Sequence, residues 1–369
     1  MKVPILTPSN ISSTDNYGFA RAPETIEKIQ YGRFRNVYLY ITDECQLRCG
    51  HCYMGDRLEA ATEMPLKEVF HNLTTWRKMG GSKLSILGGE PTLHPDFLEI
   101  VQYANHLGYE KVILNTNGLA PSRRILAAVR PDDFAYIQIS LDGASSKTHD
   151  IIRGKGTFNQ AWRTTSALCA SGFDTRIICT VNRVNIDECL DLLPMADAIG
   201  VSLVKFHVFS GIGLGSRNEQ WIVTPTDWID FYERLETYKG KYKTRIWYQP
   251  TYARKHKVQR FANEGFRGCV GRTLDRISIF PDGRAYVCSY LFDTQLNYAN
   301  MINGQITINK DRNEFDLFTS VLAKASCGSC KAESICMGGC PAEDLVMGGA
   351  SCLADADIVP VCRLWKSEV

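Results

Sequence analysis

The chain has 369 residues, of which 44% are hydrophobic and 22% are charged, an ordinary composition for a water-soluble protein of two or three domains. Its formal net charge of +2 gives no reason to expect a nucleic acid or an anionic membrane as a partner. The N-terminal sequence lacks the apolar core of a signal peptide, and no run of about 18 apolar residues could span a membrane. We therefore expect a cytoplasmic protein, in which fourteen cysteines indicate metal binding rather than disulfides.

The first 245 residues are predicted to form an N-terminal extension and an α/β domain. Residues 1–33 are rich in Ser, Thr, Asn and Pro, with one possible helix at Pro23–Gln30. In residues 34–245 short apolar segments alternate with amphipathic segments, a pattern typical of a parallel sheet built from βα units. The six predicted strands are Val37–Thr42, Lys83–Leu87, Lys111–Asn115, Ala135–Ser140, Arg176–Val181 and Leu203–Phe209. The predicted helices are Pro65–Met79, Pro95–Leu107, Pro121–Val129, Phe158–Ser171 and Ile186–Ala198.

The predicted strands are apolar on one face and polar on the other. Buried parallel strands are usually apolar on both faces. Here the polar face consists of Tyr38, Tyr40, Thr42, Tyr136, Gln138, Ser140, Asp142, Lys205 and His207. Because helices between the strands should cover the apolar face, we expect the polar face to line the inside of the domain and to hold a polar ligand. The alternative is an ordinary amphipathic sheet with one solvated face.

Three cysteines follow the first predicted strand within one short loop. Cys45, Cys49 and Cys52 stand at positions i, i+4 and i+7. Iron–sulfur clusters are normally held by four thiolates, so three thiolates leave one iron available for another ligand. The alternative is a structural zinc site, which requires four nitrogen or sulfur ligands in a closed tetrahedron.

This spacing resembles the CX3CXΦC signature of the radical S-adenosylmethionine (SAM) superfamily, with His51 where that family usually has an aromatic residue. The resemblance implies a [4Fe-4S] cluster whose fourth iron is chelated by the amino and carboxylate groups of SAM. It implies that one electron from the cluster cleaves SAM, and that the resulting 5′-deoxyadenosyl radical removes a hydrogen atom from the substrate. It also implies an open, partial (β/α)6 barrel with the cysteine loop at the C-terminal ends of the strands.

Further segments at the ends of the strands resemble the SAM-binding segments of this family. Gly88-Gly89-Glu90-Pro91 is similar to its GGE motif, in which glycine backbone approaches the methionine end of SAM. Chemically, Ser140 offers a hydroxyl and Arg153 a guanidinium suited to a carboxylate, although either could instead order a loop. The residues that the resemblance assigns to SAM are Tyr53, Gly88, Gly89, Glu90, Asn117, Ser140, Asp142 and Arg153.

A second group of cysteines occupies the C-terminal third of the chain, residues 246–369. Pro281-Asp282-Gly283 between two short apolar segments predicts a β-hairpin. The cysteine spacing resembles a SPASM domain, which implies two auxiliary [4Fe-4S] clusters and a total of three. The implied ligands are Cys269, Cys288 and Cys340 for one cluster, and Cys327, Cys330, Cys336 and Cys362 for the other. Cys352 is the alternative to Cys362, or it closes the first auxiliary cluster, which lacks a cysteine between Cys269 and Cys288.

The resemblance implies a radical SAM/SPASM oxidase, for which we expect a ribosomally made peptide as the substrate. Ser289 replaces the aspartate that follows the second SPASM cysteine in sulfatase maturases, which argues against that role. Lys205 and His207, two residues apart on one strand face, are the candidate catalytic residues. The alternatives are a dehydrogenase or epimerase of a small polar metabolite, such as a sugar or aminoglycoside, and a non-enzymatic iron–sulfur electron carrier.

The expected partners follow from the same resemblance. A flavodoxin or ferredoxin would supply single electrons. About 35 residues precede the first predicted strand, too few for a leader-binding module with its own core, so a separate leader-binding protein is a possible partner. The remaining Cys169, Cys179 and Cys189 are expected to be small core residues.

Overall fold

The computed structural model describes residues 34–248, 251–263, 274–309, 313–314, 342 and 357–360. The predicted helix Pro23–Gln30 lies outside these ranges. So do seven of the predicted cluster ligands, namely Cys269, Cys327, Cys330, Cys336, Cys340, Cys352 and Cys362. Within the described ranges, no helix has the length and apolar character needed to cross a membrane.

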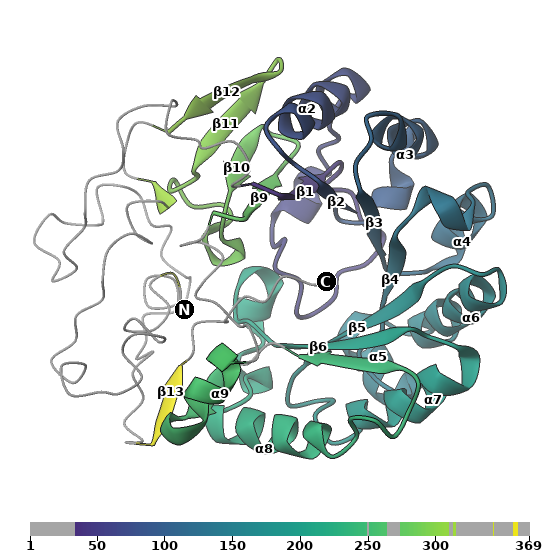
Figure 1. Cartoon of the computed structure of the whole chain (residues 1–369), viewed down its shortest axis with the longest axis vertical. Helices are drawn as coiled ribbons and strands as arrows, with labels where there is room; N and C mark the ends of the chain where they lie inside the picture. Colours follow the sequence, from purple (N-terminus) through teal and green to yellow (C-terminus); the bar gives the residue numbers. More distant parts are fainter. Residues whose placement is uncertain are drawn as a thin grey trace, which may run out of the picture.

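The six predicted strands all form, and each is a parallel neighbour of the next. They are β1 (Asn36–Tyr40), β2 (Lys83–Leu87), β3 (Lys111–Thr116), β4 (Tyr136–Ser140), β5 (Thr175–Val181) and β6 (Leu203–Val208). A further parallel strand, β7 (Arg245–Tyr248), pairs with β6 and was not predicted. The sheet curves into a partial barrel with helices on its outer side, as Figure 1 shows. The predicted α/β partial barrel is therefore confirmed.

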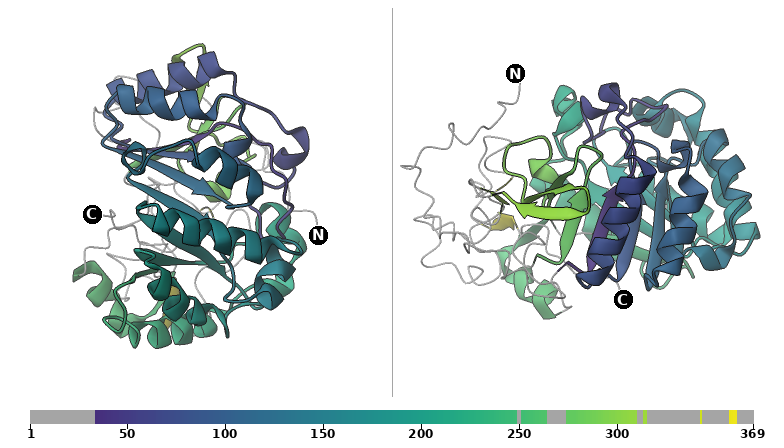
Figure 2. Two further views of the ribbon diagram at one scale, coloured as in Figure 1. Left: turned by 90° about the vertical axis from the view of Figure 1, so that its right-hand side faces the viewer. Right: turned by 90° about the horizontal axis from the view of Figure 1, so that it is seen from above.

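Helices cover the convex side of this sheet, as two further views show (Figure 2). They are α2 (Leu66–Lys78), α3 (Phe97–His106), α4 (Ala120–Leu126), α5 (Ser146–Arg153), α6 (Thr157–Ala170), α7 (Leu192–Ile199), α8 (Pro225–Glu236) and α9 (Val258–Asn263). The short helix α1 (Arg57–Ala60) instead follows the cysteine loop, where Leu58 packs in a cluster with Tyr40 and Phe280. In α2, Val69, Leu73 and Trp76 recur at helical spacing and are fully buried against the sheet. The same side of the sheet contributes Leu39, Ile137 and Val204 to the core.

Several helices differ from the sequence prediction: α1, α5, α8 and α9 were not predicted, and α7 has a different start. Helix α5 forms where only a loop motif was recognised, because Ser145 accepts a hydrogen bond from the backbone of Lys147 at its start and Gly154 ends it. Helix α7 begins six residues later than predicted, since the side chains of Asn182 and Asn185 bond nearby backbone groups and hold a turn there.

The predicted hairpin is present and is part of the barrel sheet. Strands β9 (Arg276–Ile279) and β10 (Arg284–Tyr286) flank the predicted turn, and β9 pairs in parallel with β1. Strands β11 (Ala299–Ile302) and β12 (Gln305–Ile308) continue the sheet, while β8 (Tyr252–Arg254) and β13 (Ile358–Pro360) form a separate pair. One eleven-stranded sheet thus runs through the predicted barrel domain into the predicted C-terminal domain.

Candidate active site

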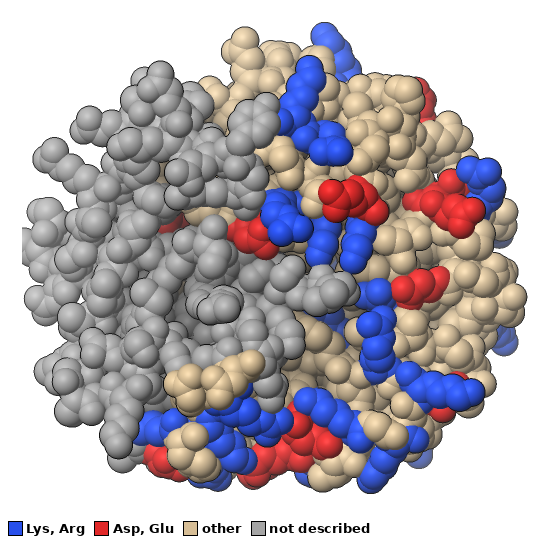
Figure 3. Space-filling model, viewed as in Figure 1, with Lys and Arg blue, Asp and Glu red and all other residues tan. Residues whose placement is uncertain are grey.

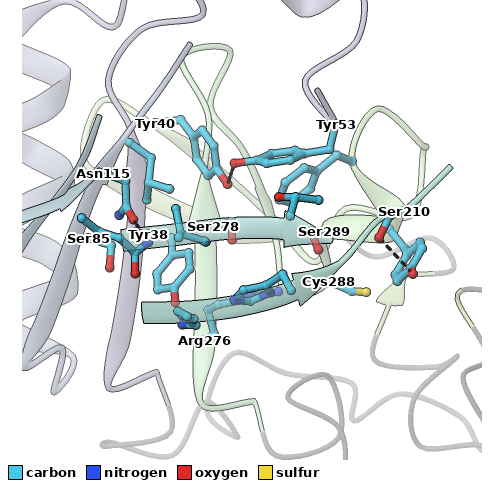
Figure 4. A pocket seen from close by; sticks show the side chains of 18 of the residues that line it. Tyr38, Tyr40, Tyr53, Ser85, Asn115, Ser210, Arg276, Ser278, Cys288 and Ser289 are labelled. Atoms are coloured by element: carbon cyan, nitrogen blue, oxygen red, sulfur yellow. Dashed lines mark hydrogen bonds between the residues drawn. The ribbon is translucent and has the colours of Figure 1, made fainter. Parts of the chain in front are cut away.

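Two adjoining cavities lie at the inside of the barrel. The first, of about 200 Å³, is lined by the cysteine loop, the Gly88–Glu90 segment and the ends of β3 and β4. The second, of about 260 Å³, is lined by the inward side of the strands and by the loop that follows β10 (Figure 4). The cavities share His51, Tyr53, Asn115, Gln138 and Thr180 in their walls, so that a molecule bound in one lies next to the other.

The three cysteines of the loop all line the first cavity as free thiols. Burial raises the pKa of Cys45 to about 12 and that of Cys52 to about 11, and it also raises the pKa of Cys49. Buried thiols of this kind become thiolates when a metal supplies positive charge, because metal ligation requires the deprotonated form. Three such thiols in one wall fit the implied iron–sulfur cluster. In the described part of the chain, no three His, Cys, Asp or Glu side chains converge on the position of a single metal ion.

The two glycines after β2 allow that segment to pack directly on the cysteine loop. A Cβ atom on Gly89 would lie 2.3 Å from the carbonyl oxygen of Glu44, and one on Gly88 would lie 2.5 Å from that of Thr42. The Gly89 amide donates to Thr42 at 2.8 Å. Both glycines line the first cavity, which is consistent with the prediction that their backbone faces SAM.

The carboxylate of Glu90, in contrast, is used within the protein. Glu90 is fully buried and accepts hydrogen bonds from the backbone amide of Asn117 at 2.7 Å, the Thr116 hydroxyl at 2.8 Å and the Thr92 hydroxyl at 2.6 Å. Burial raises the pKa of Glu90 in spite of these donors. Glu90 therefore holds the end of β3 in place beside the cavity, a role that the sequence did not reveal.

Arg153 and Asp142 form a buried ion pair behind the cysteine loop. The guanidinium Nε lies 2.5 Å from the Asp142 carboxylate, Nη1 lies 3.8 Å from Cys49 Sγ, and Nη2 lies 3.3 Å from His51 Nε2. Burial acts to raise the pKa of Asp142, but Arg153, His51, His149 and the Thr180 amide together outweigh it, and the pKa is lowered. Asp142 lines neither of the two cavities; its carboxylate contacts Arg153, His51 at 3.4 Å and the backbone amide of Thr180 at 2.7 Å.

Several polar groups remain directed at the first cavity. Arg153, Ser140 and Asn117 line it, and the buried Asn117 Nδ2 has no hydrogen-bond partner among the described residues. An unpartnered buried amide is costly unless a ligand satisfies it. A cation, a hydroxyl and an amide donor together suit a ligand with a carboxylate and sugar hydroxyls, so these residues fit SAM.

Lys205 and His207 line the second cavity, as the strand alternation predicted. Both contact Trp247 of β7: Lys205 Nζ lies 4.4 Å from the centre of its ring, and the imidazole lies 5.5 Å from it. Sequence reasoning missed Trp247, because its strand has only four residues and was not recognised. Thr42, predicted on this inner face, lines neither cavity. Its backbone forms an isolated antiparallel β-bridge with Glu63.

Aromatic residues and the loop after β10 complete the second cavity. Tyr53, in the wall that the two cavities share, forms a hydrogen bond of 2.9 Å to Tyr40 (Figure 4). Burial raises the pKa of Tyr53 to about 12, so that both hydroxyls remain protonated near neutral pH. The loop contributes Cys288, Ser289, Tyr290 and Phe292 to the wall. A predicted auxiliary-cluster ligand, Cys288, thus lies at the barrel cavity. Cys179 and Cys189 are core residues, as predicted, and Cys169 packs partly buried against the core.

Comparison with known proteins finds one family model and several similar proteins. Residues 39–196 match the model of the radical SAM superfamily. Mycofactocin maturase MftC of Mycobacterium ulcerans is 33% identical over 186 residues, 49% of this chain and 50% of that protein, so the alignment spans about half the length of this relative. MftC of Mycobacterium tuberculosis is 27% identical over 86% of this chain and 81% of the relative.

A solved structure shows the same fold. Streptococcus suis SuiB bound to its precursor peptide SuiA superimposes with a TM-score of 0.68 at 17% identity, over 92% of this chain and 78% of SuiB. The cysteine triplet, the glycine segment and strands β2 to β5 of the barrel all belong to the part of the chain that the family model matches. Residues 39–196 of this chain therefore form a radical SAM domain, and the chain as a whole is similar to the maturase MftC.

Proposed function

We propose that this chain is a radical SAM/SPASM enzyme that oxidatively modifies a ribosomally made peptide. The observation that carries the proposal is the pair of adjoining cavities with common wall residues. A radical generated in the first cavity would meet a substrate in the second without crossing solvent. The relatives support a peptide substrate, since MftC is named a maturase and SuiB is seen with a precursor peptide.

The radical SAM domain implies one [4Fe-4S] cluster and SAM, which together supply the radical that removes a substrate hydrogen atom. In our proposal Cys45, Cys49 and Cys52 hold the cluster. Asn117, Ser140 and Arg153 bind the polar groups of SAM, while Gly88 and Gly89 provide close backbone contact. Glu90 and Asp142 orient Asn117 and Arg153 respectively, through the hydrogen bonds described above.

The residues of the second cavity act on the substrate. Lys205 and His207, held against Trp247, are placed to bind a polar group of the substrate or to accept a proton from it. Tyr53 stays protonated and therefore acts as a hydrogen-bond donor or a steric wall rather than as a base. The substrate carbon that loses its hydrogen atom would lie between the SAM site and these residues.

We further propose two auxiliary [4Fe-4S] clusters on the C-terminal cysteines, with Cys288 as one ligand. Supporting this, Cys288 lies beside the substrate cavity, where an electron left on the substrate could be taken up. A flavodoxin or ferredoxin would supply electrons to the first cluster, and a separate leader-binding protein could deliver the peptide.

Anaerobic reconstitution followed by SAM cleavage under dithionite tests the first step of the proposal. The full chain should bind about twelve iron atoms and form 5′-deoxyadenosine, while a Cys45→Ala/Cys49→Ala/Cys52→Ala variant should retain about eight and form none. Cleavage by the triple variant would overturn the site assignment. An iron content near four in the full chain would remove the auxiliary clusters from the proposal.

The substrate class requires a second measurement. The full chain, SAM and dithionite are incubated with any short peptide encoded beside this gene, with and without any neighbouring small protein, and the peptide mass is recorded. Loss of hydrogen from the peptide supports the proposal. An unchanged peptide, together with turnover of a sugar-type metabolite, would replace the peptide by a small polar substrate.

A further inference from the structure

A buried arginine outside both cavities joins the cysteine loop to the wall of the second cavity. Arg57 begins α1, five residues after Cys52, and its side chain is only 7% exposed. Its guanidinium forms ion pairs with Asp293 at 2.5 Å, Asp282 at 3.0 Å and Asp43 at 3.8 Å. Two regions more than 220 residues apart, residues 43–57 and residues 282–293, therefore meet at one cation.

The Asp293 contact fixes one end of the loop 288–293. Asp293 has a φ of +65°, a left-handed conformation that residues other than glycine rarely adopt. At the other end of the loop, the backbone amide of Cys288 donates to the buried carboxylate of Glu314 at 2.9 Å. Between these two anchors lie Cys288, Ser289, Tyr290 and Phe292, the residues that form the cavity wall.

Arg57 is also connected to the wall that the two cavities share. Its guanidinium lies 4.3 Å from the centre of the Phe280 ring. Tyr40 stacks on the same Phe280 ring, with centroids 4.2 Å apart, and forms the hydrogen bond to Tyr53. Contacts through Arg57 thus reach the second cavity from two directions, the loop and the shared wall.

Resting on the proposed function, we propose that Arg57 is a positioning residue that fixes the 288–293 wall of the substrate cavity relative to the SAM site. A planar guanidinium can serve several carboxylates at once, whereas a lysine ammonium cannot present the same fork. Without Arg57, the loop opens locally while the cysteine loop still holds its cluster. SAM cleavage then continues, but the substrate is no longer held against the SAM site.

Hydrogen–deuterium exchange of the reconstituted full chain tests this without any substrate. Arg57→Gln should speed exchange of the amides of residues 288–294 by about tenfold or more. Amides in β3, β4 and β5 should be unaffected, and the EPR spectrum of the reduced SAM-bound cluster and the rate of dithionite-driven 5′-deoxyadenosine formation should be unchanged. Arg57→Lys should fall between wild type and Arg57→Gln.

Arg217→Gln is the matched control, because Arg217 forms an exposed ion pair of 3.0 Å with Asp56, the residue that precedes Arg57. It should leave exchange throughout the chain unchanged. If Arg57→Gln does not fold, Asp293→Asn, whose aspartate is 44% exposed, removes one partner of the same cluster and should loosen the same amides. Unchanged protection of 288–294 in a folded variant, equal loosening in Arg217→Gln, or uniform loosening of the whole barrel would each overturn the proposal.

A kinetic measurement follows once a peptide substrate is known. Arg57→Gln should raise KM for the peptide and increase the ratio of 5′-deoxyadenosine to product, with the rate in the absence of peptide unchanged. Failure to find a peptide substrate would count against the proposed function, but it would leave the exchange result on Arg57 intact.

Discussion

The two cavities are built in different ways. The first is formed by short, contiguous motifs whose polar groups are largely satisfied by one another, as in the Glu90 and Arg153 networks. The second is formed by single side chains from many strands and one distant loop, and its charged residues lie against an aromatic ring. Substitutions in the networks around the first cavity should therefore affect folding as well as cofactor binding. Substitutions in the second should affect the substrate with little effect on stability.

The largest effect on stability is expected at Arg153. Arg153→Met leaves the buried Asp142 carboxylate without its ion pair, and breaking a buried pair in this way costs about 3–5 kcal/mol in the free energy of unfolding. Denaturant unfolding measures this cost. The double variant Arg153→Met/Asp142→Asn should regain much of the stability without regaining SAM cleavage. Full SAM cleavage in the double variant would show that Arg153 serves the fold alone.

A smaller loss of stability is expected at Glu90. In Glu90→Gln the amide nitrogen takes the place of one acceptor oxygen and faces a donor, so one of the Asn117, Thr116 and Thr92 donors loses its partner. The expected cost is about 1–3 kcal/mol. SAM affinity should fall in parallel, because Asn117 is no longer held, and isothermal titration measures it. Unaltered stability and affinity would contradict the role given to Glu90.

The smallest effect on stability, and the sharpest contrast, is expected at His207. His207→Ala removes a side chain of the cavity wall, and it should change the free energy of unfolding by less than about 1 kcal/mol. Cleavage of SAM in the absence of substrate should continue while product is lost. Unchanged product formation would reject a role for His207, and loss of SAM cleavage would show that the two cavities are not functionally separate.

The sequence was most informative where a local pattern determines the structure. The six strands follow from period-two alternation and short apolar runs, and the cysteine loop follows from the spacing of Cys45, Cys49 and Cys52. The inward position of Lys205 and His207 also follows, because alternate residues of a strand point to one side.

The remaining features depend on contacts between distant segments. The short strand β7 and its Trp247 carry too few residues for a periodic signal. Asp142 stands in a motif typical of a ligand contact, but burial beside Arg153 determined its partner. The role of Arg57 could not be read from sequence, since Asp282 and Asp293 lie more than 220 residues further along the chain.

The parallel pairing of β1 with β9 has a consequence for biosynthesis. Asn36 to Leu39 are made early, yet one edge of their strand stays uncovered until Arg276 to Ile279 have left the ribosome. Unpaired strand edges and slow long-range pairing expose a growing chain to aggregation. This side of the sheet can therefore be completed only after more than 270 residues have been synthesised, and a chain truncated before β9 would leave β1, the strand that leads into the cysteine loop, with an open edge.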